Sequence, residues 1–343
     1  MKAVRFHKHG GPEVLQYEDA PDPVLKSPEE ALVRVKACAL NRLDIWGRMG
    51  PPYSKPSLPH ISGCDIAGVI EEVPPHEKEL REGTEVIVSP GVGCGRCERC
   101  LSGNDNQCRR YSIIGNELDG GYAELVVAPL RNLLPKPERM DFVQAASVPL
   151  VFLTAYHMLV TKARVQPGET VMVLGAGSGV GIAAIQIAKA YNANVIATAG
   201  SESKLAKAVE LGADHTVNHR TTKVSEEARK YTEGRGVDVV VEHPGKATWE
   251  ESLKSVAKGG RIVTCGATTG FDAVTDLRYL FSREIAVFGS YMGGSGELLR
   301  VLELFKQRRL RPVVDVAMPL SRARDAQVRM EKSEHFGKIL LTV

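Results

Sequence analysis

The sequence predicts an α/β fold with two domains, one irregular and β-rich, the other built on a doubly wound parallel sheet. The chain has 343 residues, 43% of them hydrophobic, and a chain of this length is long enough for two ordinary domains. Its texture also changes near residue 150. We place the first domain at 1–149 and 292–343 and the second at 150–291.

Short β-like runs fill the first part of the chain. Residues 31–36 and 85–88 alternate with glycine and proline turns, which is the pattern of an irregular β-rich domain. The last strand expected, at 338–343, follows one helix that starts near Leu298. We expect this tail to return to the first domain.

Strands and helices alternate after residue 150. The apolar run 171–174 is ended by glycines, and apolar residues then recur at helical spacing from Val180 to Tyr191, which predicts a strand, a tight turn and a helix. A second helix is expected from Glu202 to Leu211. Further strands are expected at 194–198, 237–241, 261–264 and 285–288. This alternation predicts a parallel, doubly wound sheet.

Charge and hydropathy exclude several classes of function. The 44 basic and 41 acidic residues give a net charge of +3 and are scattered, so we expect neither nucleic acid nor a membrane as a partner. No apolar run approaches the roughly 18 residues of a membrane span, and the chain does not open on a signal sequence. Three isolated cysteines, Cys38, Cys64 and Cys265, suit a reducing compartment. We expect a cytoplasmic protein.

Four cysteines lie within fifteen residues, spaced C-x2-C-x2-C-x7-C: Cys94, Cys97, Cys100 and Cys108. Four thiolates at roughly 2.3 Å complete the tetrahedral coordination of zinc and leave no open position, so such a site is structural. Two disulfides are the alternative, but Cys-x-x-Cys pairs close strained loops and are reduced inside cells. We expect one structural zinc per chain, in a lobe at about 90–110.

A glycine-rich turn follows the strand at 171–174 and opens a helix. Its spacing departs from strict G-x-G-x-x-G, but its position in a βαβ unit predicts that backbone amides bind a dinucleotide pyrophosphate. The residues expected to do so are Gly175, Gly177, Ser178, Gly179, Val180 and Gly181.

The end of the next strand bears on the choice between NAD and NADP. An acidic residue normally holds the ribose 2′-hydroxyl of NAD there, but residues 198–201 contain none. Ser201, Lys204 and Arg220 offer a hydroxyl and two cations that suit a 2′-phosphate. We therefore expect NADP(H) to be favoured, although Glu202, one turn later, leaves NAD open.

Taken together, these features resemble the zinc-containing medium-chain dehydrogenase/reductase family, over nearly the whole chain. Residues 63–70 look like the family's G-H-E-x-x-G-x-V segment, and residues 120–124 like its G-G-x-A-E strand. The resemblance implies a GroES-like catalytic domain, a Rossmann domain, a cleft between them, and homodimers or homotetramers joined partly through the last Rossmann strand near Phe288.

The chain departs from the family at the catalytic zinc. The alcohol dehydrogenases of the family hold this metal through a Cys, the His of G-H-E and a later Cys or Asp. Here Asn41 stands at the Cys position, Cys64 at the His position, and Leu150 or a neighbour at the third. Leucine does not bind metal. An improvised site built from Cys38, His60, Cys64 and Asp65 stays open as an alternative.

Asn41-Arg42-Leu43-Asp44 instead resembles the quinone reductase branch, whose asparagine touches the nicotinamide and which uses no catalytic metal. Hydride transfer to a conjugated carbonyl needs close approach of two carbons and a hydrogen-bond donor for the enolate oxygen. The candidate catalytic residues are Asn41, Tyr53, Asp44 and Cys64. Asn41 and Tyr53 are possible donors, and Asp44 orients its neighbours.

Further positions match the family's cofactor contacts. By resemblance these are Asn41, Thr154, Gly266, Ala267, Ser290, Tyr291, Met292 and Lys338. The sequence therefore predicts NADPH-linked reduction of a quinone, enone or other conjugated carbonyl without catalytic metal. Two alternatives remain: a zinc-dependent alcohol dehydrogenase with an atypical metal site, and a cofactor-binding protein without turnover.

Overall fold

The computed structural model describes residues 1–52 and 54–343, so the candidate Tyr53 lies outside the described residues. The chain forms two compact units. The β-rich unit contains Met1–Leu150, Gly294–Leu302 and Pro312–Val343, and the parallel-sheet unit contains Val151–Gly293 and Glu303–Arg311. The segment Glu303–Arg311 thus packs with the parallel-sheet unit, whereas we expected the whole tail from residue 292 to join the first domain.

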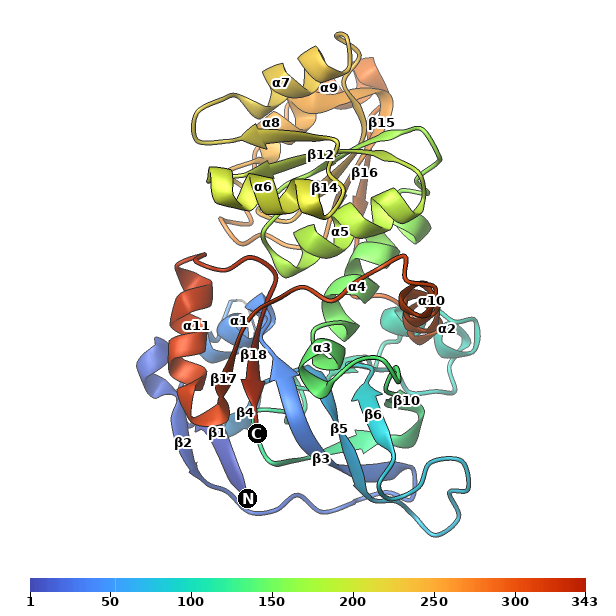
Figure 1. Ribbon diagram of the computed structural model, residues 1–343, viewed down its shortest axis with the longest axis vertical. Helices are drawn as coiled ribbons and strands as arrows, with labels where there is room; N and C mark the ends of the chain where they lie inside the picture. Colours follow the sequence, from blue (N-terminus) through green and yellow to red (C-terminus); the bar gives the residue numbers. More distant parts are fainter. Residues whose placement is uncertain (53) are drawn as a thin grey trace. The chain divides into compact units, whose positions relative to one another are not determined.

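The β-rich unit contains a seven-stranded sheet in the order β10-β6-β5-β3-β18-β17, with β9 also paired to β3, a three-stranded sheet in the order β2-β1-β4, and the pair β7-β8 (Figure 1). Its strands are β1 (Lys2–Phe6), β2 (Gln16–Asp19), β3 (Glu30–Ala39), β4 (His60–Ile61), β5 (Asp65–Glu72), β6 (Glu85–Val88), β7 (Gly91–Val92), β8 (Ser112–Ile113), β9 (Leu125–Pro129), β10 (Leu133–Pro135), β17 (Val314–Pro319) and β18 (Lys338–Thr342). Strand β3 shows why this sheet forms. Ala31, Val33, Val35 and Ala37 are buried in the core, and the residues that alternate with them are half-buried and mostly polar.

The helices of this unit are short: α1 (Arg42–Met49), α2 (Glu98–Leu101), α3 (Phe142–Ala146) and α11 (Ala323–Glu331). Two further helices, α4 (Pro149–Tyr156) and α10 (Ser295–Lys306), have residues in both units. The tail does return to the β-rich unit, because β18 pairs antiparallel with β3, placing Leu341 opposite Cys38. Strand β17 and helix α11 were not predicted from the sequence, and in α11 the many polar residues weaken the apolar period.

The parallel-sheet unit has six parallel strands in the order β13-β12-β11-β14-β15-β16. Their bounds are β11 (Thr170–Val173), β12 (Asn194–Ala199), β13 (His215–Asn218), β14 (Val237–Glu242), β15 (Val256–Thr264) and β16 (Ala286–Gly289). Numbered within the sheet, this order is 3-2-1-4-5-6, the doubly wound dinucleotide-binding topology, in which ligands bind where the strand order reverses. Sequence analysis missed β13, which contains a single aliphatic residue.

Helices cover both faces of this sheet (Figure 1). They are α5 (Gly179–Ala190), α6 (Glu202–Glu210), α7 (Val224–Tyr231), α8 (Trp249–Ser255) and α9 (Leu277–Arg283). Helix α5 packs on β11 and β12 and buries most of its length, which its run of alanine, isoleucine and glycine allows. Among the described residues, no helix is long and apolar enough to cross a membrane.

A buried carboxyl group fixes the start of α1. Asp44 is fully buried and accepts hydrogen bonds from the Asn41 amide at 2.7 Å, the Tyr122 hydroxyl at 3.0 Å and the Gly63 amide at 3.2 Å. Asp44 therefore ties the helix to the loops before β5 and β9. Burial raises the pKa of this carboxyl group to about 6, although the hydrogen bonds oppose the shift.

We predict that the stability contributed by Asp44 falls as the pH rises from about 4 to about 6. The folded chain then holds a proton that the unfolded chain, with a carboxyl pKa of about 3.9, has lost, so the free energy of unfolding decreases with pH. Thermal midpoints of the wild type and Asp44→Asn, measured at pH 4.5, 5.5 and 7, should differ most at pH 4.5. A difference that is constant or grows with pH would contradict the prediction.

Candidate functional site

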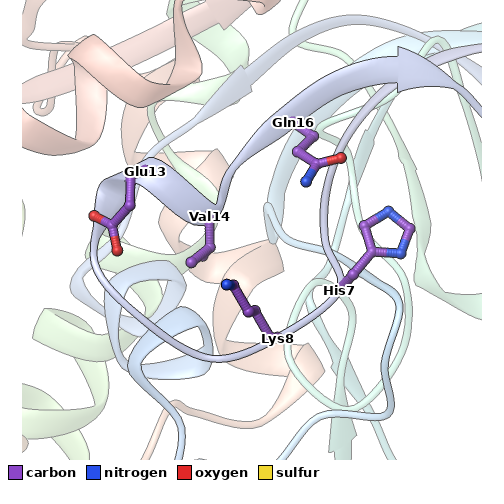
Figure 2. Close-up of a pocket in the computed structure, with 5 residues that line it drawn as sticks. All are labelled: His7, Lys8, Glu13, Val14 and Gln16. Atoms are coloured by element: carbon purple, nitrogen blue, oxygen red, sulfur yellow. The ribbon is translucent and has the colours of Figure 1, made fainter.

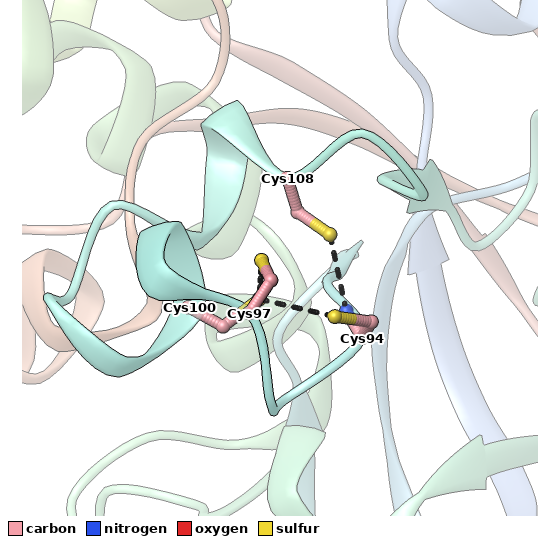
Figure 3. Close-up of side chains that lie close together, drawn as sticks. All are labelled: Cys94, Cys97, Cys100 and Cys108. Atoms are coloured by element: carbon pink, nitrogen blue, oxygen red, sulfur yellow. Dashed lines mark hydrogen bonds between the residues drawn. The ribbon is translucent and has the colours of Figure 1, made fainter.

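The four predicted zinc ligands lie together in the β-rich unit. The sulfur atoms of Cys94, Cys97, Cys100 and Cys108 all lie within 4.8 Å of one another (Figure 3). Cys100 Sγ is 3.6 Å from Cys97 Sγ and 4.0 Å from Cys94 Sγ. Tetrahedral zinc with sulfur ligands at about 2.3 Å places the sulfurs about 3.8 Å apart. None of the four is in a disulfide, and the donor set is compatible with a structural zinc.

The loop around these cysteines is shaped to present sulfur. At Gly93 a Cβ atom would lie 2.9 Å from Cys100 Sγ, and Gly95 has φ of +74°. The Arg96 amide and the Arg110 side chain lower the pKa of Cys94 to about 5. Partial burial raises the pKa of Cys100 to about 12, so a metal that binds here displaces a proton from this thiol.

A second group, the Asn41 cluster, consists of Asn41, Cys64, Asp65 and Lys338, and all four are almost fully buried in the β-rich unit. Lys338 Nζ donates to Asp65 Oδ2 at 2.9 Å and to Asn41 Oδ1 at 2.6 Å. The Asn41 side-chain nitrogen donates to Asp65 Oδ2 at 2.9 Å and lies 3.3 Å from Cys64 Sγ. The structure thus gathers the residues that stand where the family holds a catalytic zinc, together with a lysine.

The chemistry of this cluster does not fit a zinc site. Leu150, at the third ligand position, contributes only its backbone amide, which donates to Asp65 Oδ1 at 2.6 Å. Cys64 offers a single sulfur ligand, and burial raises the pKa of its thiol, so a metal would have to displace the proton here as at Cys100. One oxygen of Asp65 already pairs with the Lys338 ammonium. An amide, a neutral thiol and a paired carboxylate leave too few free ligands.

The improvised metal site also lacks one of its members. His60 Nε2 lies 3.2 Å from the Gly115 carbonyl, and His60 Nδ1 lies 3.4 Å from Asp119 Oδ1. Within residues 1–52 and 54–343, the four cysteines are the only group of three or more potential ligands gathered closely enough for one ion. Cys38 is fully buried, and burial raises the pKa of its thiol as well.

The glycine turn has the geometry expected of a pyrophosphate cradle. Gly175 has φ of +59°, and at Gly181 a Cβ atom would lie 2.3 Å from the Gly175 carbonyl oxygen, so both positions require glycine. Ser178 caps α5 by accepting a hydrogen bond from the Gly181 amide at 2.9 Å. The twelve-residue helix therefore begins at an open turn of small residues, where backbone amides favour anionic groups. Gly177 belongs to the same turn, and Gly179 and Val180 are the first two residues of α5.

His243, which was not predicted as a site residue, contacts both ends of this turn. It follows β14, and its Nε2 lies 2.8 Å from the Leu174 carbonyl oxygen and 3.2 Å from Ser178 Oγ. Strand β14 pairs with β11 at the point where the strand order reverses. The sequence alone does not show that the position of His243 lies next to the glycine turn.

The loop after β12 gathers positive charge. Arg220 Nε and His219 Nε2 lie 2.9 and 3.0 Å from where a Cβ atom of Gly200 would stand. Burial, then the charges of Arg220 and Lys204, lower the pKa of His219. Ser201 occupies the N-cap position of α6 in this loop, without a side-chain capping hydrogen bond. His219 was not predicted as a site residue. It lies 18 residues after Ser201 in the sequence and directly follows β13, a strand that was not predicted either.

Glu202, the acidic residue that could still bind the ribose of NAD, already accepts a hydrogen bond within the protein. Glu202 Oε1 accepts a hydrogen bond from Asn218 Nδ2 at 2.6 Å, and Asn218 Oδ1 accepts one from the Arg220 amide at 3.1 Å. This chain of contacts ties Glu202 Oε1 to the end of β13, while the second carboxylate oxygen keeps its capacity to accept a hydrogen bond from a ribose.

Two predicted cofactor contacts have unsatisfied hydroxyl groups. Thr154 Oγ1 and Ser290 Oγ are buried and have no hydrogen-bond partner among the described residues, a feature that a bound polar ligand would relieve. Met292 is buried with φ of +53°, while Tyr291 is about half exposed. Gly266 and Ala267 follow β15, and at Gly266 a Cβ atom would lie 3.0 Å from the His243 carbonyl oxygen.

A surface hollow of about 420 Å³ lies elsewhere in the β-rich unit. It is lined by His7, Lys8, Glu13, Val14 and Gln16, from the loop between β1 and β2 and the start of β2 (Figure 2). His7 Nε2 pairs with Glu18 Oε1 at 2.7 Å. None of the predicted site residues lines this hollow.

Comparison with known proteins agrees with this arrangement. Residues 27–138 match the alcohol dehydrogenase GroES-like domain, and residues 179–307 match the zinc-binding dehydrogenase family. These matches confirm the predicted GroES-like and Rossmann domains.

Full-length relatives extend the match. An NAD-dependent alcohol dehydrogenase of Sulfolobus acidocaldarius is 33% identical, covering 100% of both chains. A quinone oxidoreductase of Homo sapiens is 33% identical over 78% of this chain and 73% of its own. A crystal structure of an NAD-dependent alcohol dehydrogenase superposes with a TM-score of 0.97 at 46% identity, covering 100% of both chains. This chain therefore belongs to the medium-chain dehydrogenase/reductase family and is an NAD(P)-dependent oxidoreductase of the alcohol dehydrogenase and quinone reductase type.

Proposed function

We propose that this enzyme uses NADPH to reduce a quinone, an enone or another conjugated carbonyl, and that no metal takes part in the reaction. The observation that carries the proposal is the donor set of the Asn41 cluster. An amide, a buried neutral thiol and a carboxylate already paired with Lys338 do not supply the three free ligands of a catalytic zinc.

The bound cofactor would supply the hydride, and the chain would position the acceptor carbon and stabilise charge on its oxygen. Asn41 is held for a positioning role. Its oxygen accepts from Lys338, and its amide hydrogens face Asp65 Oδ2, Cys64 Sγ and the Ala39 carbonyl oxygen at 3.4 Å. The donor to the enolate oxygen is then more suitably the unsatisfied hydroxyl of Thr154 or Ser290. Tyr53 remains a proposed donor outside the described residues.

The preference for NADPH is supported by the basic loop after β12. Arg220 and His219, which follow β13, lie beside Gly200 in this loop, and the charge of Lys204 acts on His219. Asn218 donates a hydrogen bond to Glu202. A 2′-phosphate would accept charge-assisted hydrogen bonds from such a group, whereas a ribose hydroxyl gains little from it.

We also propose one structural zinc at the four cysteines and a homodimer or homotetramer joined at β16. This strand lies at the edge of its sheet, with β15 as its one partner among the described strands. The loop before α9 and α9 itself expose Val274, Leu277 and Phe281, and such apolar surface favours self-association.

A zinc-dependent alcohol dehydrogenase is the second candidate. It is favoured by the names of two of the relatives described above, one of them 46% identical. Oxidation of a primary alcohol near neutral pH requires a group that lowers the pKa of the alcohol, as zinc does for bound water. The two candidates therefore differ in substrate and in dependence on metal.

We predict one zinc per chain that survives dialysis, because metal binding is coupled to folding of the loop around the four cysteines. Cys97→Ser should lower the zinc content and the thermal midpoint before it changes the rate per folded molecule. Cys265→Ser, outside the cluster, should keep one zinc. Metal-free protein with unchanged melting would exclude the structural zinc.

We predict that NADPH binds more tightly than NADH, by roughly 10- to 100-fold at low ionic strength, as two charge-assisted hydrogen bonds would provide. Arg220→Ala should remove about tenfold of this gap without weakening NADH, while Lys230→Ala, the same charge change on α7, should not. The gap should widen only at pH values below the usual histidine range, because burial and the nearby cations lower the pKa at which His219 gains a proton. Nicotinamide fluorescence measures both constants, and an NADH preference would refute the assignment.

We predict that hydride transfer from NADPH to a small quinone or enone survives chelators that strip loosely held metal. Asn41→Ala should slow it by roughly 10- to 100-fold by disturbing the nicotinamide side of the site. Asn132→Ala is the matched control, because it removes another buried side-chain amide. The Asn132 amide donates to the Ser89 and Gly91 carbonyl oxygens, and Asn132 is not one of the predicted site residues. Oxidation of a primary alcohol that depends on added zinc would favour the second candidate.

A further inference from the structure

Lys338 is an unusual residue to find in the interior. It is 2% exposed, and an ammonium group has three N–H donors. Lys338 Nζ donates to the Leu40 carbonyl oxygen at 2.7 Å, to Asn41 Oδ1 at 2.6 Å and to Asp65 Oδ2 at 2.9 Å. All three acceptors belong to the β-rich unit, so the hydrogen-bonding capacity of the ammonium is fully used there.

The partner of this cation is equally buried. Asp65 is the first residue of β5 and has no exposed surface. Its Oδ2 accepts from Lys338 and Asn41, and its Oδ1 accepts from the Leu150 amide. A carboxylate buried in this way is tolerated only when it is paired and hydrogen-bonded. Replacing only the lysine would leave the Asp65 charge buried without a partner, which costs more stability than replacing both members of the pair.

The ammonium also fixes which way the Asn41 amide faces. With the oxygen toward Lys338, the side-chain nitrogen donates to Asp65 Oδ2 and approaches Cys64 Sγ. A flipped amide would set its NH₂ group against the ammonium and its oxygen against the Asp65 carboxylate, so two attractive contacts would become repulsive. One orientation is therefore selected by charge.

We propose that Lys338 is the fixed internal cation of the Asn41 cluster, which neutralises Asp65 and sets the orientation of Asn41, as a bound metal would otherwise do. It is then a positioning residue. This role differs from the cofactor contact that the family resemblance implies for Lys338. The neutralisation of Asp65 stands without the proposed function, whereas the importance of Asn41 for the reaction rests on it.

A double-mutant cycle on the full-length, zinc-loaded protein tests the proposal. The variants are Lys338→Met, Asp65→Asn and the two combined, and the readouts are the thermal midpoint and the dissociation constant of NADPH. Lys338→Met should lower the midpoint by roughly 5–10 °C. The combined variant, which buries neither charge, should recover more than half of this loss. The dissociation constant of NADPH should rise by less than tenfold in folded Lys338→Met, because the lysine acts on the cofactor only through Asn41.

The chain offers a matched control in Lys136, whose side chain is 6% exposed and pairs with Glu85 at 3.1 Å. Glu85 is 53% exposed, so its charge is solvated without the lysine. Lys136→Met should therefore cost less than Lys338→Met, and adding Glu85→Gln should not restore stability.

Two results would overturn the proposal. One is additive loss of stability in the combined variant. The other is an unchanged midpoint in Lys338→Met with NADPH affinity reduced tenfold or more, whether residue 65 is Asp or Asn, which would make Lys338 a cofactor ligand. If Lys338→Met does not fold, a folded combined variant supports charge compensation and an unfolded one contradicts it. Failure to reduce any quinone or enone, with the coupling intact, would overturn only the proposed function.

Discussion

A buried ion pair holds the centre of the β-rich unit together. Lys338 begins the last strand, Asp65 begins β5, and the amide between them, Asn41, caps α1. Three segments that are far apart in sequence thus meet through hydrogen bonds of 2.6 to 2.9 Å. Because the charges compensate only when all three segments are in place, the same contacts that complete the sheet also orient the side chains proposed to face the nicotinamide.

The two cysteine environments show why one kind of residue serves different purposes. Around Cys94, backbone amides and an arginine stabilise negative sulfur and lower its pKa to about 5. Around Cys64, burial next to Asp65 and Asp44 raises the pKa of the thiol well above its ordinary value. The first environment stabilises the Cys94 thiolate, although burial raises the pKa of the neighbouring Cys100, whereas the second favours a neutral thiol. The contrast supports the structural zinc that we propose at the first position and the metal-free reaction that we propose at the second.

Much of this architecture was predictable, because it follows from the periodicity of apolar residues and from the spacing of glycines and cysteines along the sequence. The glycine turn, the cysteine cluster and five of the six parallel strands, all but β13, lie where the local pattern predicts them. The roles of Lys338 and His219 were not predictable, because each depends on residues that the fold brings from another strand. Sequence also did not show that Glu202 is engaged by Asn218. Local rules locate motifs, while charge pairing across the fold decides what the motifs do.

The most direct test of the account is a crystal structure of the zinc-loaded enzyme with NADPH, with anomalous scattering recorded on both sides of the zinc absorption edge. We expect one zinc peak per chain, surrounded by Cys94, Cys97, Cys100 and Cys108, and lysine nitrogen without anomalous signal between Asn41 and Asp65. A second zinc peak beside Cys64 and Asp65, with Lys338 displaced, would contradict the account and favour a metal-dependent alcohol dehydrogenase.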